Sequence, residues 1–192
     1  MSNNFQKISQ ALQFMAIAHD GQYRKNSGHP YIVHTIAVAS IVEKYYPLDF
    51  NSTVYIAALL HDTIEDTDVT YTAIIEKFGS YVANVVKGCT KIEKDPSLNR
   101  QQRTELNKER WANSSLPIRI IKVADMIDNL SDVHELDKDF ALMYLKEKHE
   151  LLYAIKHGVS EEMVEEARLT IERGYAKLMY NALFDGLYFR LF

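Results

Sequence analysis

Residues 54–67, VYIAALLHDTIEDT, place an apolar run directly before one histidine and three acids. The run from Val54 to Leu60 is typical of a helix buried in a protein core. A helix that leaves the core could simply turn polar at its end. Alternatively, these polar side chains line a pocket and hold a positive ion. The rest of the sequence has to decide between the two interpretations.

The spacing of the polar residues favours the pocket. Glu65 lies four residues after His61 and three after Asp62, so on a helix these side chains project to one side. Carboxylates this close repel each other unless a cation or protons intervene. Imidazole together with carboxylate is a ligand set for a divalent transition metal. Chance or helix capping explains most isolated His-Asp pairs, but the acids Glu65 and Asp66 one turn later favour a metal site.

The bulk properties indicate one soluble, helical domain. We expect the 192 residues to form a single domain, and seven glycines with four prolines suit long helices. Cys89 is the sole cysteine, which excludes an intrachain disulfide and favours a reducing, cytoplasmic location. No signal-peptide pattern or membrane-spanning apolar run is visible. The net charge of −4 argues against general binding to nucleic acid, but not against a small anion in a basic pocket.

Helical spacing of apolar residues dominates the chain. We therefore predict an all-α fold, a helical bundle of about eight to ten helices. Asn51 or Ser52 is expected to cap the helix that ends near His61. Ser115 with Pro117 predicts another helix start.

Two further candidates lie in apolar surroundings elsewhere in the chain. His34 follows an apolar turn in HPYIVHTIAVAS, and Asp125 follows Val123 and Ala124 in IKVADMIDNL. Taken alone, His34 suits a hydrogen-bonded core histidine, and Asp125 suits the solvated side of an amphipathic helix. A buried acid, however, is costly unless it is paired or ligates a metal.

In sequence order these residues form the pattern H…HD…D, the signature of the HD phosphohydrolase superfamily. The segments YRKNSGHPYIVH, AALLHDTIEDT, FGSYVANVVKGCTK and IIKVADMIDNLSDV closely resemble the hydrolase domain of RelA/SpoT-type alarmone enzymes. The motif-bearing part covers about residues 5–136, and helices at 138–183 are expected to pack on it. The chain resembles a stand-alone small alarmone hydrolase of the metazoan SpoT-homologue type.

The resemblance implies a guanosine-3′,5′-bis(diphosphate) 3′-pyrophosphohydrolase, which converts (p)ppGpp to GDP or GTP. It implies one Mn²⁺ per chain, bound by His34, His61, Asp62 and Asp125. It also implies that Glu65 and Asp66 act on the attacking water. The implied substrate contacts are Arg24, Lys25, Ser27 and Asn129.

Some residues keep a second interpretation. Surface solvation would explain Arg24 and Lys25, and a turn cap would explain Asn129, if the motif were absent. Met126 stands where the family usually has a basic residue, which could alter substrate choice. Tyr144 and Lys148 lie one turn apart, and we expect them to serve helix packing rather than the pocket.

Other functions remain open at this point. The same pocket could serve another nucleotide phosphohydrolase, an NADPH 2′-phosphatase or a (p)ppApp hydrolase. A catalytically silent alarmone-binding module and a purely structural helical module are the alternatives from other classes. A homo-oligomer, and an alarmone synthetase toxin as genetic partner, are compatible with the sequence.

Overall fold

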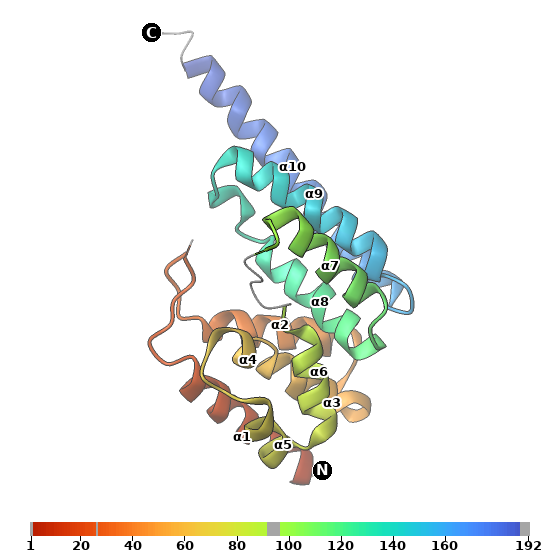
Figure 1. The fold of residues 1–192 in the computed structure, drawn as a ribbon. Helices are drawn as coiled ribbons and strands as arrows, with labels where there is room; N and C mark the ends of the chain where they lie inside the picture. The colour runs from red at the N-terminus through yellow and green to blue at the C-terminus, as the bar shows by residue number, and fades with distance from the viewer. Residues whose placement is uncertain (1, 26, 92–96, 189–192) are drawn as a thin grey trace.

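A computed structural model describes residues 2–25, 27–91 and 97–188. The described residues form ten α-helices and one 3₁₀ helix, which confirms the predicted all-α class (Figure 1). The helices are α1 (Ser2–Ala18), α2 (Ile32–Tyr45), α3 (Leu48–Leu60), α4 (Thr63–Asp66), α5 (Tyr71–Phe78), α6 (Ser80–Cys89), α7 (Arg100–Ala112), α8 (Leu116–Asn129), η1 (Val133–Glu135), α9 (Lys138–Ile155) and α10 (Glu161–Tyr188).

Helix α3 lies in the core of the part of the bundle formed by the N-terminal helices. It packs against α1, α2 and α6, and its residues Ile56 to Leu60 are at most 4% exposed. A helix that is apolar all round needs neighbours on every side, and these three helices provide them. The opening stretch of the sequence is therefore the core helix, and His61 lies at its end.

The predicted helix starts have mixed outcomes. Ser115 is the N-cap of α8 and Pro117 lies in its first turn, as predicted. The cap predicted at Asn51 or Ser52 is wrong, because α3 begins at Leu48, directly after Pro47. Proline disfavours a helical conformation at the residue before it, so the chain leaves α2 and can begin a new helix at once.

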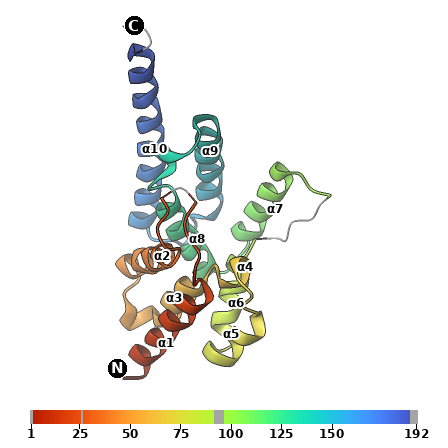
Figure 2. The same cartoon turned by 90° about the vertical axis from the view of Figure 1, so that its left-hand side faces the viewer.

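The C-terminal helices pack on the part that carries the motifs. Helix α8 contacts α2 and α6 on one side and α10 on the other, and α7 packs against α9. Figure 2 shows α9 and α10 beside α8, on the opposite side from α1 and α5, with the last turns of α10 extending beyond the bundle. Within the described residues, we find no helix with the length and hydropathy required to cross a bilayer.

Candidate metal centre

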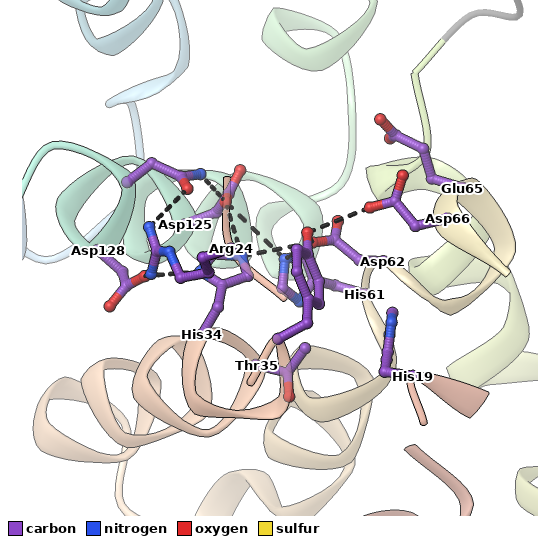
Figure 3. Close-up of polar contacts among 12 residues, drawn as sticks. His19, Arg24, His34, Thr35, His61, Asp62, Glu65, Asp66, Asp125 and Asp128 are labelled. Carbon is purple, nitrogen blue, oxygen red and sulfur yellow. Dashed lines mark hydrogen bonds and ion pairs between the residues drawn. The ribbon is translucent and has the colours of Figure 1, made fainter. Parts of the chain in front are cut away.

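Four side chains from three parts of the chain converge at one point (Figure 3). His34 comes from the first turn of α2, His61 and Asp62 from the junction of α3 and α4, and Asp125 from α8. The Nε2 atom of His34 lies 3.3 Å from Asp62 Oδ2 and 3.4 Å from Asp125 Oδ1. The Nε2 atom of His61 lies 3.1 Å from Asp62 Oδ2 and 3.8 Å from Asp125 Oδ1. All four residues are buried.

Both imidazoles are held by their Nδ1 atoms. His61 Nδ1 lies 2.7 Å from the carbonyl oxygen of Ala58, and His34 Nδ1 lies 2.6 Å from Asp128 Oδ2. A proton on Nδ1 satisfies these acceptors and leaves the Nε2 lone pair facing the two carboxylates. Within the described residues, the buried Nε2 of His61 finds no hydrogen-bond partner. This orphaned atom and the two-nitrogen, two-oxygen donor set fit a divalent transition metal.

Charge in the cluster leads to the same conclusion. Burial lowers the pKa of His34, but hydrogen bonds to Asp125, Asp128 and Asp62 outweigh it and raise this pKa to about 11. Burial likewise lowers the pKa of His61, and the nearby charge of Asp62 outweighs it and raises that pKa to about 9. The two buried carboxylates therefore attract positive charge strongly, as protons or as a cation.

Lys122 is a buried cation beside the cluster. Its Nζ lies 2.8 Å from Asp125 Oδ2 and 4.6 Å from the centre of the Trp111 ring. Burial raises the pKa of Asp125, but the charge of Lys122, the largest opposing effect, helps to hold it well below its usual range. Met126, where the resemblance led us to expect a basic residue, is fully buried. Positive charge thus reaches Asp125 from one turn earlier in α8.

The acids Glu65 and Asp66 lie in α4, at the side of the cluster. Glu65 accepts hydrogen bonds from the backbone N–H of Lys91, at 2.9 Å, and from its ammonium group. The Tyr31 hydroxyl lies 2.6 Å from Asp62 Oδ2 and 3.1 Å from Asp66 Oδ2, so it bridges a candidate metal ligand and a candidate catalytic acid. Burial and the charges of Asp62 and Glu65 raise the pKa of Asp66.

The cluster opens into a cavity of about 1100 Å³ between α7, α9 and the metal-site helices. Asp62, Glu65, Asp66 and Asp125 form part of its wall. Basic side chains in the wall include Arg24, Lys25, Lys91, Arg100, Arg103 and Lys148. Although the net charge of the chain is −4, the cavity wall thus brings cations close to the candidate metal ligands, where they can bind the phosphates of an anionic ligand.

Most of the predicted substrate residues face this cavity. Arg24, Lys25 and Asn129 lie in its wall. Arg24 pairs with Asp128, and its Nη2 lies 3.3 Å from Asn129 Oδ1. Ser27 lies apart from the wall formed by the described residues, and its buried hydroxyl has no hydrogen-bond partner among them.

One interpretation changes. For Tyr144 and Lys148, helix packing was favoured over a position facing the pocket, but both lie in the cavity wall. The Tyr144 ring stacks on Phe140, with ring centres 6.0 Å apart, and the Lys148 ammonium lies 4.9 Å from the centre of the Tyr144 ring. Their spacing was visible in the sequence, but the side of α9 that faces the cavity depends on how α7 packs.

The domain model described as "HD domain" matches residues 11–155. The chain therefore belongs to the HD domain family, whose sequence pattern the convergent cluster matches.

Two relatives and one solved structure show which members of this family the chain is similar to. The Drosophila melanogaster "Guanosine-3′,5′-bis(diphosphate) 3′-pyrophosphohydrolase MESH1" is 38% identical over 128 residues, which cover 66% of this chain and 69% of that protein. A Haemophilus influenzae protein with the same enzyme name, without the MESH1 suffix, is 35% identical over 151 residues. This alignment covers 77% of the chain but only 22% of that relative's length. A solved structure titled as a metazoan orthologue of SpoT that hydrolyses ppGpp superimposes with a TM-score of 0.77 and 29% identity, covering 87% of this chain and 94% of that one.

Proposed function

We propose that the chain is a metal-dependent (p)ppGpp 3′-pyrophosphohydrolase, which consumes water, releases pyrophosphate and leaves GDP or GTP. The observation that carries this proposal is the convergence of His34, His61, Asp62 and Asp125 at one side of a cavity whose wall also carries basic side chains. The printed names of the similar proteins, which describe ppGpp hydrolysis, support it. The proposal concerns the activity of this chain, which spans only about a fifth of the length of the Haemophilus relative.

The four convergent residues would hold one Mn²⁺ per chain. When bound, such an ion lowers the pKa of a coordinated water and neutralises phosphoryl oxygens. The protein contributes the orientation: the bonds at Nδ1 direct the Nε2 atoms of His34 and His61 toward the carboxylates. Lys122 keeps Asp125 ionised and therefore able to ligate.

Glu65 and Asp66 would orient the attacking water and accept its proton. Both lie in the cavity wall, beside the metal-site carboxylate Asp62. Burial and neighbouring charge raise the pKa of Asp66, which makes it a better proton acceptor than an ordinary aspartate. Lys91 fixes Glu65 through two hydrogen bonds and keeps its carboxylate at the wall.

Arg24, Lys25 and Asn129 would bind the nucleotide. A guanidinium can pair with phosphate through two parallel hydrogen bonds or stack on a base, and an ammonium acts as a point charge for phosphate. Asn129 can present its amide to a base edge or a sugar hydroxyl. Ser27, in the same loop as Arg24, completes the predicted set and is the member with the least support from geometry.

The decisive experiment incubates the purified chain with Mn²⁺ and, separately, with (p)ppGpp, (p)ppApp or NADPH, and identifies the products. We expect GDP or GTP with pyrophosphate from (p)ppGpp, and no turnover after EDTA treatment. Orthophosphate from NADPH as the preferred reaction would instead identify the 2′-phosphatase. Preferred cleavage of (p)ppApp would identify an adenine-alarmone hydrolase, and nucleotide binding without turnover a silent module. Each of these three results contradicts the proposal.

The remaining expectations stay predictions. These are a single domain over residues 1–192, a cytoplasmic location, a homo-oligomer and an alarmone synthetase as genetic partner. Co-expression with such a synthetase would test the last one, because a hydrolase should relieve the growth arrest that alarmone accumulation causes.

A further inference from the structure

We propose that Asp128 is a positioning residue that couples the nucleotide-binding loop to the metal centre, because one of its oxygens holds both His34 and Arg24. Asp128 Oδ2 lies 2.6 Å from His34 Nδ1, and the same oxygen accepts a hydrogen bond from Arg24 Nη1 (Figure 3). The inference rests on the proposed function, since it assigns a role toward the metal and the substrate.

The position of Asp128 on α8 explains its contact with His34. Asp125 and Asp128 are three residues apart, so their side chains share one side of the helix. They contact opposite nitrogens of the same imidazole: Asp125 Oδ1 lies 3.4 Å from Nε2, and Asp128 Oδ2 lies 2.6 Å from Nδ1. An acceptor at Nδ1 selects the tautomer whose Nε2 lone pair is free for a metal.

The partner of His34 differs in charge from the partner of His61. His61 Nδ1 is held by a backbone carbonyl, which no side-chain substitution removes. His34 Nδ1 is held by a carboxylate whose side chain is 13% exposed. A carboxylate behind a ligating histidine fixes the ring and increases its basicity. His34 therefore depends on Asp128 in a way that a substitution can test.

Arg24 forms the other half of the coupling. Its guanidinium comes from the loop between α1 and α2, whose backbone is closed by Arg24 N–H to His29 O at 2.8 Å and Gly28 N–H to Arg24 O at 3.0 Å. A second acid, Asp132, also approaches Arg24, with Oδ1 3.7 Å from Nη2. Among the described residues, the Asp128 carboxylate pairs with both His34 and Arg24, whereas the Asp132 carboxylate pairs with Arg24 and not with His34. Asp132 thus provides a matched control of equal charge.

The test compares Asp128→Ala, Asp128→Asn, Asp132→Ala and Arg24→Ala in the full chain. Mn²⁺ affinity is measured on metal-free protein by the electron paramagnetic resonance signal of free Mn²⁺, and kcat and KM are measured separately. We expect Asp128→Ala to weaken Mn²⁺ binding by about 10- to 100-fold and to raise KM. Asp132→Ala should raise KM while Mn²⁺ affinity stays near the wild-type value. Arg24→Ala removes one of the two groups bound to Asp128 Oδ2, so it should raise KM and also change Mn²⁺ affinity, by less than Asp128→Ala does.

Asp128→Asn tests the same contact with His34 if the alanine variant does not fold. Its amide oxygen can still accept the Nδ1 proton but carries no charge, so we expect Mn²⁺ affinity between those of wild type and Asp128→Ala. Wild-type Mn²⁺ affinity in both Asp128 variants would overturn the coupling. An equal loss of Mn²⁺ affinity in Asp132→Ala would also overturn it, because the effect would then come from the net charge of the site and not from the contact with His34. If the wild-type chain itself bound no Mn²⁺ or left (p)ppGpp intact, the proposed function would be wrong, and the role of Asp128 would be wrong as well. Failure of the coupling alone is seen only in the variants.

Discussion

Glu65 is held by Lys91, through both its backbone N–H and its ammonium group, and not by the histidines of the cluster. Changing Glu65 to glutamine should therefore leave the candidate metal ligands in place. The amide cannot accept the water proton, so kcat should fall by about 10²- to 10⁴-fold while Mn²⁺ affinity stays unchanged. Steady-state kinetics with (p)ppGpp, together with Mn²⁺ titration, checks both parts. Hydrolysis at the wild-type rate would show that Glu65 has no role in handling water.

The ionisation of Asp66 affects the stability of the folded chain. Its pKa is raised in the folded chain by burial and by Asp62 and Glu65. An acid with a raised folded-state pKa favours folding below its unfolded value, near 3.8, and that contribution is lost as the pH rises through the folded value. Ionised Asp66 is thus unfavourable at pH 7.

We therefore expect Asp66→Asn to raise the Tm of the metal-free protein at pH 7, by about 1 °C because solvent screens the exposed part of the group. The gain should shrink as the pH falls toward 4. Thermal denaturation in EDTA at pH 7, 5.5 and 4.5 measures it, with Asp68→Asn, an exposed acid nearby, as the control. A gain in Tm of the same size at every pH, or a lower Tm at pH 7, would show that the pKa of Asp66 is not raised in the folded chain.

The site residues were predictable to different degrees. The positions of His34, His61, Asp62 and Asp125 follow from a sequence pattern, and the structure brings their side chains together. Tyr31 and Lys122 were missed, since their roles depend on contacts between helices. An apolar helix that contains a lysine three residues before a candidate ligand is the signal that could have identified Lys122.

At the scale of the element, α8 carries Asp125, Asp128 and Asn129, so its distance from the rest of the bundle determines the geometry of the site. Its packing on α6 depends on Gly88. A Cβ atom at Gly88 would lie 2.2 Å from Cδ1 and 2.9 Å from Cγ1 of Ile118. Gly88→Ala should therefore destabilise the protein by about 1–3 kcal/mol, less the helix preference of alanine over glycine, as measured by urea denaturation.

A double-mutant cycle provides the control for this contact. Ile118→Val removes the Cδ1 atom, so Gly88→Ala should cost less in that background than in the wild type. An equal cost in both backgrounds would show that this contact does not set the distance between α6 and α8.

Helix boundaries show what the sequence pattern could not supply. Apolar spacing predicted the helical class, and Ser115 with Pro117 predicted the start of α8. Capping residues also placed the start of α3 too late, because Asn51 and Ser52 have the side chains of good caps although the chain already becomes helical after Pro47. Capping chemistry identifies candidate starts, and packing decides which of them is used.

At the scale of the whole molecule, the candidate metal ligands join α2, the junction of α3 and α4, and α8. An ion bound by all of them would act as a crosslink between segments that are far apart in the sequence. Because the unfolded chain cannot assemble this set of ligands, the binding free energy adds to the stability of the fold.

Adding Mn²⁺ at about 100 times its dissociation constant should stabilise the wild-type chain by about 2.7 kcal/mol. For a chain of this length, this corresponds to a rise in Tm of roughly 5–11 °C. Asp125→Asn should abolish the rise, because it removes an anionic ligand from the centre of the cluster. Each protein is compared with its own metal-free Tm, since the loss of the Lys122 partner will also lower the starting stability of the variant. Equal Mn²⁺-induced shifts in the two proteins would mean that the ion binds elsewhere, and that the convergence of the four side chains serves the fold and not a metal.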